Sequence, residues 1–440
     1  MSGPRGYGPL LRTPGALAFS AAGLVGRMPI SMLGIGTVLL VEDRRGSYAL
    51  AGLVSAAYAF GLAVFGPLVS RLVDRRGQRQ ILLPALAISA AGIIGLVVLA
   101  DTAAAAGWLM LAAAVTSMSA TQLGACARAR WSATLSAARR PGEIPRAYAW
   151  EAVVDEVVFV LGPLVVVVCA LLDPAVGLLA ALTLAALGTL SFAAQRATEP
   201  PLKAGDRGPH RSALASPGLR TLTATMLCVG VLFGTVEVSM VAFAQERGSA
   251  AGGGLLLALV AGGSAVAGLL YGAVHWKSPL HRRFPLSLGA LAVLLLPLLL
   301  APSVGLMAPA ALLAGVAISP SLIGAFGLVD PLVPPGAQTE GFSWLNSGLG
   351  IGVAGGLAVA GAVADGAGAR TALSIAVAGA LAAAGVALAA RRTLVPQPAA
   401  WAGDVCGRDE GKRGVCQHDA GAGGTENEGY PARLTPPGDS

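Results

Sequence analysis

Charged and aromatic residues are scarce in this 440-residue sequence. Asp, Glu, Lys and Arg together make up 12% of it, and Phe, Trp and Tyr make up 5%. Soluble globular domains carry about 25% charged residues, so the composition excludes that class for most of the chain. Apolar residues reach 55% and the mean hydropathy is +0.71. Lipid must therefore be the solvent for most of the chain.

The residues that carry enzyme chemistry are also few and dispersed. The chain has four histidines and five cysteines, and it contains no paired-histidine metal motif, no phosphate-binding Gly-Lys loop and no nucleophile elbow. Cys126, Cys169 and Cys228 lie in or beside apolar segments, whereas Cys406 and Cys416 lie in a polar tail, so no disulfide framework is implied. We expect no catalytic residue, no metal and no cofactor. The missing phosphate loop excludes an ATP-driven pump within this single chain.

Long apolar runs recur from Ala16 to Ala390. A helix of about 20 residues spans the hydrocarbon core of a bilayer, whereas barrel strands would show short alternating segments. The sequence therefore predicts an all-α integral membrane protein with twelve transmembrane helices. The first run continues to Val41 without a small-residue cleavage site, which indicates a retained span rather than a signal peptide. The predicted spans are 16–41, 47–70, 81–100, 106–127, 149–172, 175–195, 220–244, 252–275, 284–301, 304–329, 339–363 and 370–390.

The net charge of +7 is distributed unevenly between the two sides of these spans. Most basic residues fall in the breaks after the even-numbered spans, and the other breaks hold only Arg44, Arg45, Arg247 and Arg370. Because cytoplasmic loops are rich in Lys and Arg, this pattern predicts an inner (cytoplasmic) membrane protein with both termini in the cytoplasm. The positive charge is thus a topology signal, and we expect no nucleic acid as a partner. The break between the tenth and eleventh spans, which has no basic residue, is an exception.

A polar segment at 196–219 separates six spans from six. We expect an N-terminal bundle over 1–195, a cytoplasmic linker over 196–219, a C-terminal bundle over 220–392 and a disordered tail over 393–440. The two halves repeat at an offset of 202 residues, from Gly46 to Gly248. Parallel repeats occur in secondary transporters, so we expect two pseudo-symmetric six-helix bundles around a central cavity. At this offset Gly52, Gly61 and Gly66 match Gly254, Gly263 and Gly268.

The loop after the second span, residues 70–79, carries the sharpest motif. It resembles the G-x-L-a-D-R-x-G-R-R loop of the major facilitator superfamily, and within it that of the bacterial drug/proton antiporter-like efflux proteins. Ser70 replaces the first glycine of the motif. The resemblance covers about residues 10–392, and it implies that the aspartate and arginine latch the second helix against the eleventh at the cytoplasmic side. The matching residues are Asp74, Arg75, Gly77 and Arg79.

Gly162 and Pro163 in the fifth span carry a second resemblance. They are similar to the core of the antiporter motif G-x-x-x-G-P-x-x-G-G, although Val158, Val166 and Val167 replace its other glycines. A Gly-Pro pair is also an ordinary kink in a membrane helix. The pair therefore predicts a kink in helix five, and the resemblance favours antiport over symport.

Ionisable residues at membrane depth cost about 3 kcal/mol each to insert, so those that persist usually line a cavity or a proton path. Arg27 lies in the first span, Glu151, Asp155 and Glu156 lie in the fifth, and Glu237 lies in the seventh. The candidates for proton coupling are Glu156, Asp155, Glu237 and Arg27. We expect Glu156 or Glu237 to be the coupling carboxylate, with Arg27 as its counter-ion in one state. The alternative is a static buried pair that holds helix one against helix five or seven.

Polar residues at helical spacing in the fourth and eleventh spans are candidates for a substrate cavity. Such residues also bond neighbouring helices in static membrane bundles. The cavity candidates are Gln122, Glu340, Ser343, Trp344 and Asn346.

These features together predict a secondary active transporter that works by alternating access and functions as a monomer. Its partners are a small-molecule substrate, protons and the lipid bilayer. The leading interpretation is proton-coupled efflux of a drug or metabolite, and the alternative is proton-coupled uptake of a sugar or other nutrient. A membrane sensor or a membrane-embedded enzyme is a more remote alternative, because the tail has no recognisable output domain.

Overall fold

The computed structural model describes residues 7–117, 122–201, 212–249, 252–274, 276–334 and 336–396, with the backbone alone for residues 48, 49 and 122. Contacts divide the chain into one unit that ends at Gln397 and a second from Pro398 to Ser440. The second unit lies outside the described residues, as does most of the tail expected at 393–440. All helices described below belong to the first unit.

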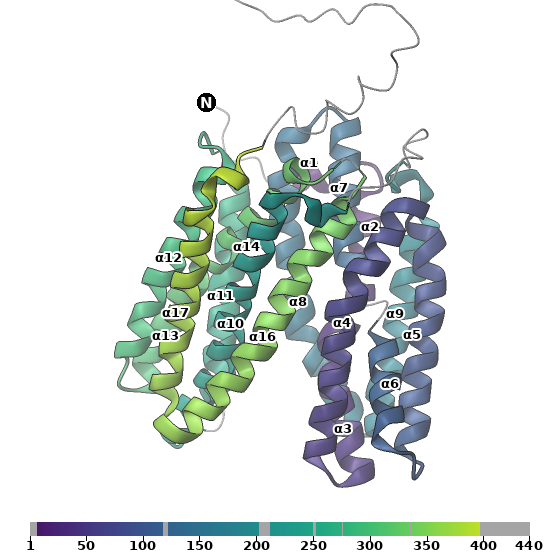
Figure 1. Ribbon diagram of the computed structural model, residues 1–440, viewed down its shortest axis with the longest axis vertical. Helices are drawn as coiled ribbons and strands as arrows, with labels where there is room; N and C mark the ends of the chain where they lie inside the picture. Colours follow the sequence, from purple (N-terminus) through teal and green to yellow (C-terminus); the bar gives the residue numbers. More distant parts are fainter. Residues whose placement is uncertain are drawn as a thin grey trace, which may run out of the picture. The chain divides into compact units, whose positions relative to one another are not determined.

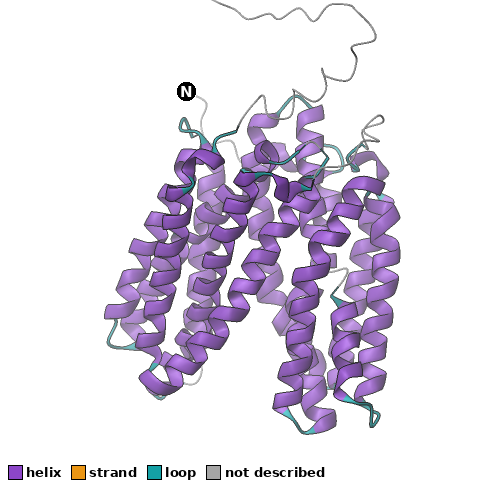
Figure 2. Cartoon of the chain, in the orientation of Figure 1, coloured by secondary structure: helices purple, strands orange, loops and turns teal. Residues whose placement is uncertain are grey.

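Helices are the only regular elements of the described residues (Figure 2). Eleven helical segments are long and apolar enough to cross a membrane, which confirms the all-α membrane class. The N-terminal half consists of α1 (Gly8–Leu11), α2 (Ala16–Arg27), α3 (Pro29–Arg45), α4 (Tyr48–Arg76), α5 (Gln78–Ala100), α6 (Ala106–Thr116), α7 (Gln122–Ala137), η1 (Pro141–Glu143), α8 (Ile144–Ala170), α9 (Pro174–Ala194) and η2 (Arg196–Thr198). The C-terminal half consists of η3 (Ala213–Ala215), α10 (Pro217–Glu246), α11 (Gly252–Ala273), α12 (Leu280–Leu300), α13 (Val304–Val316), α14 (Ile318–Gly327), α15 (Val329–Leu332), α16 (Gln338–Ala367), α17 (Ala369–Ala389) and η4 (Arg391–Leu394).

The fourth crossing differs from the single helix expected over 106–127. Helix α6 ends at Thr116 and is too short to cross a membrane alone. Helix α7 begins beyond residues 118–121, which are not described, and continues to Ala137. Its Arg128 and Arg130 lowered the local hydropathy, yet both side chains are buried, at 2% and 0% exposure. The polar sequence of α7 therefore concealed a buried helix.

The first crossing is interrupted where α2 meets α3. Pro29 opens α3 and has no N–H to donate to the preceding turn, so the helix breaks at Met28. Helix α8, in contrast, continues through Pro163. The tenth crossing is built from α13, α14 and α15 in succession.

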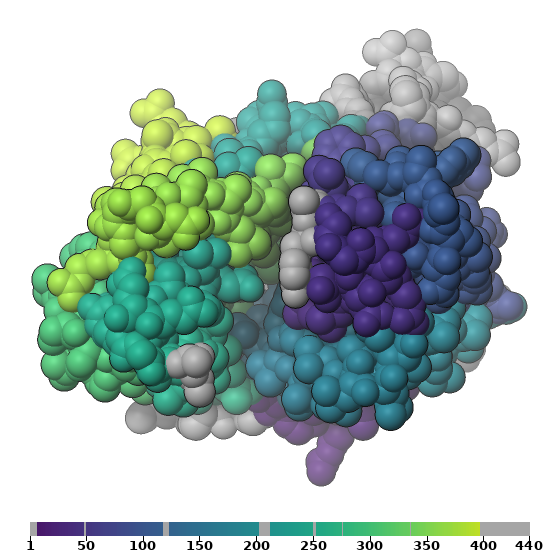
Figure 3. Space-filling view, turned by 90° about the horizontal axis from the view of Figure 1, so that it is seen from below, coloured from purple at the N-terminus to yellow at the C-terminus, as the bar shows by residue number. Residues whose placement is uncertain are grey.

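Two ends of the first unit have distinct character. We call the end with the α4–α5 turn at Gly77 the basic end, after Arg75, Arg76 and Arg79, and the end with the α3–α4 turn at Gly46 the opposite end. Figure 1 shows the two halves converging at the basic end and diverging at the opposite end. Figure 3 looks onto the opposite end and shows a furrow between the half with α3 and α4 and the half with α10 and α16.

Contacts between the halves involve matching helices. Helix α4 packs on α16, and α8 packs on α11 and α14. Counted as crossings, the second meets the eleventh and the fifth meets the eighth. Exchanging the two halves converts one of these pairs into the other, which is the relationship expected of a pseudo-twofold axis between two six-helix bundles.

Glycines allow the helices of each half to approach closely. A Cβ atom on Gly352 of α16 would lie 2.0 Å from the carbonyl oxygen of Leu227 on α10. A Cβ atom on Gly188 of α9 would lie 2.1 Å from the backbone nitrogen of Gly26 on α2. Backbones in such contact gain dispersion energy that lipid tails cannot supply, which is how membrane helices associate.

Candidate functional site

A buried carboxylate on α8 lies at the centre of the N-terminal half. Glu151 is fully buried. Its carboxylate forms an ion pair with Arg27 at the end of α2. It also accepts hydrogen bonds from Ser20 at 3.0 Å and from Trp131 Nε1 on α7 at 2.8 Å. A buried charge with this many donors is fully compensated.

Asp155, one helical turn along α8, completes a network of two arginines and two carboxylates. It accepts from Arg27 Nη1 at 2.8 Å and from Arg128 Nη2 of α7 at 2.6 Å. Arg27 and Arg128 are 1% and 2% exposed, whereas the Asp155 side chain is 33% exposed. We call Arg27, Arg128, Glu151 and Asp155 the arginine–carboxylate network. Its charges balance, and Asp155 is its accessible member.

This network shows which carboxylates Arg27 binds. In this conformation Arg27 binds Glu151 and Asp155, and the other two coupling candidates lie elsewhere. The partners Arg128 and Trp131 were missed because the part of α7 after residue 127 was interpreted as a connection between spans. The spacing of Gly124, Arg128 and Trp131, which places them on one helix face, was the available signal.

Glu156 faces the C-terminal half instead. It accepts a hydrogen bond from Ser264 of α11 at 2.8 Å, and Ser264 shares a second hydrogen bond of 2.8 Å with Ser319 of α14. This small polar cluster joins three helices from both halves. Neither serine was predicted from the sequence, because isolated hydroxyls in membrane helices carry little signal.

The α8–α11 interface follows a regular ladder toward the opposite end. A Cβ atom on Gly272 would lie 2.6 Å from the Ala149 Cβ atom, and one on Gly268 would lie 3.9 Å from Val153 Cγ2. The ladder continues with the Glu156–Ser264 hydrogen bond. One turn further along α8, Val160 is 55% exposed. Glu156 thus lies where the closed part of the interface ends.

Glu237 lies on α10 between two packing faces. Gly234 packs on α16, since a Cβ atom added to it would lie 2.2 Å from the carbonyl oxygen of Val353. Ala244 packs on α11, where its Cβ atom lies 3.2 Å from the position of a Cβ atom added to Gly252. Glu237 itself is exposed. Among the described residues it has no hydrogen-bond or ion-pair partner.

Contacts at the basic end join α4 to the first turn of α16, and we call them the gate. Asp74 accepts hydrogen bonds from the backbone N–H groups of Thr339 at 3.1 Å and Glu340 at 2.8 Å. These groups are free of helical partners at a helix N-terminus, where the dipole also favours a negative charge. Glu340 is 3% exposed, accepts from Ser212 at 2.5 Å and lies 3.8 Å from Arg71.

Further contacts close the same end. Tyr148 of α8 donates to Asp330 of α15 at 2.7 Å, and the Arg128 guanidinium lies 4.1 Å above the Phe326 ring of α14. Tyr7 donates to the carbonyl oxygen of Leu269 at 3.1 Å. Burial raises the pKa of Tyr7 to about 12, with Arg146 opposing the shift, so this hydroxyl remains a donor at neutral pH.

The other residues of the motif loop take separate places. Arg75 is exposed, and Gly77 adopts φ 94° as it links α4 to α5. The backbone N–H of Arg79 donates to Glu199 Oε1 at 3.1 Å, away from α16. Of the four matching residues, Asp74 thus forms hydrogen bonds to the eleventh crossing.

Gly162 and Pro163 lie where α8 meets α3. A Cβ atom on Gly162 would lie 1.8 Å from Ser31 Oγ. The Ser31 hydroxyl donates to the carbonyl oxygen of Val158 at 2.8 Å. Gly162 therefore permits close approach of α3, and Pro163 is accommodated within a continuous helix.

The predicted cavity residues of α16 fall into two groups. Glu340 belongs to the gate, while Trp344 and Asn346 are half-buried and Ser343 is buried. Ser343 Oγ and Trp344 Nε1 are buried and have no hydrogen-bond partner within the described residues. The side chain of Gln122 lies outside the described residues.

At the opposite end, Arg44 ties three loops together. It donates to Asp173 at 2.6 Å and to Asp101 at 2.8 Å. The hydrogen bond from Arg44 and that from the backbone N–H of Ala175 lower the pKa of Asp173 below its ordinary value. This pairing supports the loops of the N-terminal half at the end where the furrow opens.

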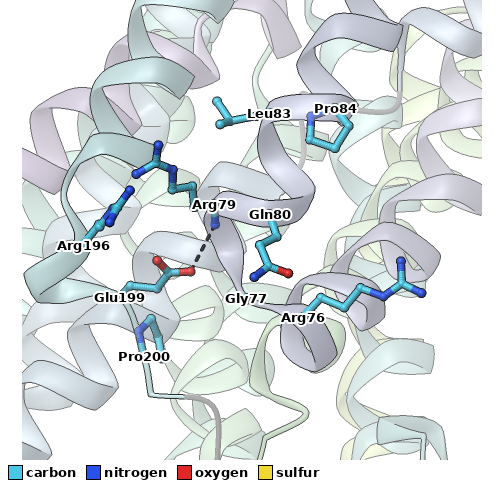
Figure 4. A pocket seen from close by; sticks show the side chains of 9 residues that line it. All are labelled: Arg76, Gly77, Arg79, Gln80, Leu83, Pro84, Arg196, Glu199 and Pro200. Atoms are coloured by element: carbon cyan, nitrogen blue, oxygen red, sulfur yellow. Dashed lines mark hydrogen bonds between the residues drawn. The ribbon is translucent and has the colours of Figure 1, made fainter.

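A cleft of about 720 Å³ lies at the basic end of the N-terminal half (Figure 4). The α4–α5 turn and the segment after α9 form it, so it is separate from the arginine–carboxylate network. Its lining includes Arg76, Arg79, Leu83, Pro84, Arg196 and Glu199.

Solved structures of several transporters resemble this one. A bacterial homologue of the iron transporter ferroportin, in an outward-facing state, matches with a TM-score of 0.67 and 16% identity over 85% of this chain and 98% of that chain. The E. coli fucose:proton symporter FucP matches with a TM-score of 0.64 and 16% identity over 88% and 99%. The human organic anion transporter MFSD10 matches with a TM-score of 0.63 and 17% identity over 86% and 98%.

At these identities the structural likeness establishes the fold alone. A search of curated protein sequences finds no match. The sequence profile of the Major Facilitator Superfamily, however, matches residues 19–339, which is most of the chain. This chain therefore belongs to the Major Facilitator Superfamily.

Proposed function

We propose that this protein is a proton-coupled secondary transporter that exports a small molecule by alternating access. The uneven distribution of basic residues supports a cytoplasmic location for the basic end and both termini, in an inner membrane. With that orientation the gate at Asp74 is cytoplasmic and closed, and the furrow opens to the outside. The ferroportin homologue that shares the fold was solved in an outward-facing state.

The position of Glu156 is the observation that carries the proposal. A coupling carboxylate must be reached from one side of the membrane at a time. Glu156 lies at the end of the closed α8–α11 interface and is bonded to Ser264 of the other half. Opening the gate separates α8 from α11, so the same motion breaks this hydrogen bond and exposes the carboxylate to the cytoplasm. Protonation of Glu156 is thereby linked to the conformational change.

The arginine–carboxylate network has a supporting role in this proposal. Its charges are balanced within the N-terminal half, so it moves with that half and keeps Asp155 accessible beside Glu156. Glu237, exposed on α10, provides a carboxylate on the C-terminal wall. We propose that Asp155 and Glu237 contact the substrate or relay the proton to and from Glu156.

Transport in membrane vesicles with an imposed proton gradient tests the function. The purified protein is reconstituted, and inverted and right-side-out vesicles are screened with drugs, metabolites and sugars. Accumulation only in inverted vesicles establishes efflux. Accumulation only in right-side-out vesicles would establish uptake by symport instead, and no response to any gradient would overturn proton coupling.

The coupling residue is tested with Glu156→Gln and Glu237→Gln. A glutamine at 156 still accepts a hydrogen bond from Ser264 but cannot carry a proton, so the fold and substrate exchange are retained while gradient-driven accumulation falls to the level without a gradient. Asp365→Asn, a change at an exposed residue of α16, is the matched control. Unchanged proton-driven accumulation in both glutamine variants would exclude these carboxylates as the coupling site.

A further inference from the structure

The cleft at the α4–α5 turn brings together three arginines from two parts of the chain. Arg76 and Arg79 flank Gly77, and Arg196 belongs to η2 after α9. Figure 4 shows that the side chains of Arg79 and Arg196 line the same cleft, with Arg76 extending from the other side of the turn. Guanidinium groups that line one cleft repel each other unless an anion lies between them.

The protein itself supplies little negative charge here. Glu199 is the one carboxylate in the lining, and its Oε1 accepts the backbone N–H of Arg79. Within the described residues, none of the three guanidinium groups forms an ion pair with a carboxylate. The cleft therefore carries an excess of positive charge that an external anion can neutralise.

The wall of the cleft continues into the lipid-facing surface of α5. Leu83 and Pro84 of the first turns line the cleft. From Pro84 an exposed apolar stripe descends the helix, with Ile88 at 43%, Ile94 at 49% and Val98 at 56% exposure. Helix α5 is a membrane-spanning segment that begins at Gln78, so the arginines lie at the level where lipid headgroups meet the acyl chains.

We propose that this cleft binds the phosphate of an anionic phospholipid. Arg79 and Arg196 donate to the phosphate oxygens from both sides, as the planar guanidinium geometry allows, and Arg76 supplies further positive charge. The acyl chains lie along the stripe that starts at Pro84. The volume of about 720 Å³ falls within the range of small-molecule sites. The bound lipid would hold the turn that follows Asp74.

The chain offers one competing occupant of the cleft. The segment 202–211, which follows the cleft directly, contains three Lys or Arg residues and only Asp206, so it cannot neutralise the arginines. The segment 397–440 contains seven Asp or Glu residues and four Lys or Arg residues. Occupation of the cleft by this acidic segment is therefore an outcome that the experiment must distinguish.

Native mass spectrometry of the purified full-length protein tests the proposal. Phosphatidylglycerol and phosphatidylcholine with the same acyl chains are titrated in turn. Wild type is expected to retain phosphatidylglycerol preferentially. Each of Arg79→Gln and Arg196→Gln should weaken its binding about fivefold, which corresponds to ~1 kcal/mol per basic residue at an anionic lipid surface. The double variant Arg391→Gln/Arg392→Gln removes two exposed arginines outside the cleft, so it should leave phosphatidylglycerol binding unchanged.

Four results would overturn the proposal. The first is equal binding of both lipids, and the second is unchanged phosphatidylglycerol binding in both single variants at the cleft. The third is full displacement of the lipid by millimolar inorganic phosphate, which would identify a free-anion site. The fourth is lipid binding that appears only after Asp404, Asp409 and Glu410 are changed to their amides, which would identify the acidic segment as the occupant. The single variants keep the test usable if the double change Arg79→Gln/Arg196→Gln prevents folding.

Discussion

Asp74 on α4 accepts the backbone N–H of Glu340 at 2.8 Å, and this hydrogen bond crosses from one half of the protein to the other. The neighbouring N–H of Thr339 donates to the second carboxylate oxygen at 3.1 Å. Both donors belong to the first turn of α16, where they have no partner within the helix. A single carboxylate side chain thus completes the end of a helix in the other half.

We expect Asp74→Asn to shift the protein toward the state with the gate open. Asparagine accepts one backbone N–H, but its amide group opposes the second donor and its side chain carries no charge for the helix dipole. Hydrogen bonds to charged groups contribute about 1.5–3 kcal/mol, so the closed state should lose roughly tenfold or more in population relative to the open state. Spin labels at Ala138→Cys and Ser278→Cys, both exposed at the basic end, measure the opening by electron spin resonance.

The labelled protein with Asp365→Asn is the control for this change. It removes a carboxylate from the same helix, at an exposed site near the opposite end. An unchanged distance distribution in Asp74→Asn would show that the Asp74–Glu340 contact does not hold the gate.

A second prediction concerns the buried pair of Arg27 and Glu151. We expect Glu151→Gln to destabilise the protein by about 3–5 kcal/mol, because it leaves a guanidinium at 1% exposure short of a charged partner. The double variant Arg27→Gln/Glu151→Gln should be more stable than Glu151→Gln alone, since the uncompensated charge is gone. Unfolding in detergent, followed for the four members of the cycle, measures the coupling. Additive losses would show that the pair contributes no interaction energy.

Much of the fold follows from the sequence because two physical signals reinforce each other. Apolar runs long enough to cross the bilayer give the helices, and the positions of arginines between them give alternating sides. The interrupted first crossing also has a local cause, since Pro29 cannot donate to the preceding turn. The predicted extent of the fourth crossing was wrong, because Arg128 is buried among partners that only the folded protein supplies.

The site was accessible to sequence analysis in its residue types but not in its pairings. Glu156, Asp155, Glu237 and Arg27 stand out because membrane-embedded charge is costly. Whether Arg27 meets Glu151 or Glu156 depends on the rotation of α8 relative to α2, which no spacing within one helix specifies. The role of Arg79 likewise depends on α9, which brings Arg196 into the same cleft.

The glycine contact between α10 and α16 gives a third prediction. A Cβ atom on Gly352 would lie 2.0 Å from the Leu227 carbonyl oxygen, whereas one on Gly355 has no neighbour within 4 Å. We expect Gly352→Ala to force the helices apart and to destabilise the protein by about 1–3 kcal/mol. Gly355→Ala should be neutral or stabilising by up to ~1 kcal/mol, since alanine favours the helix. Thermal unfolding measures the stability of the two variants, and equal stability would contradict the close contact between α10 and α16.

The last prediction concerns the ladder between α8 and α11. With Val153 Cγ2 at 3.9 Å from the Cβ position of Gly268, cysteines at these two sites are near the separation that a disulfide requires. In a chain without its native cysteines, oxidation of Val153→Cys/Gly268→Cys should lock the gate closed and abolish transport, and reduction should restore it. Transport measured before and after each treatment provides the readout.

The pair Val160→Cys/Ala261→Cys lies two turns nearer the opposite end, just beyond Glu156 and Ser264, and is the control for the ladder. Val160 is 55% exposed, which indicates that α8 has parted from α11 at this level. The control pair should therefore remain reduced while the gate is closed, and cross-link only when the halves close over the furrow. Rapid cross-linking of both pairs in the same conformation would show that the interface does not end at Glu156, and the proposed link between gate opening and protonation of Glu156 would then be lost.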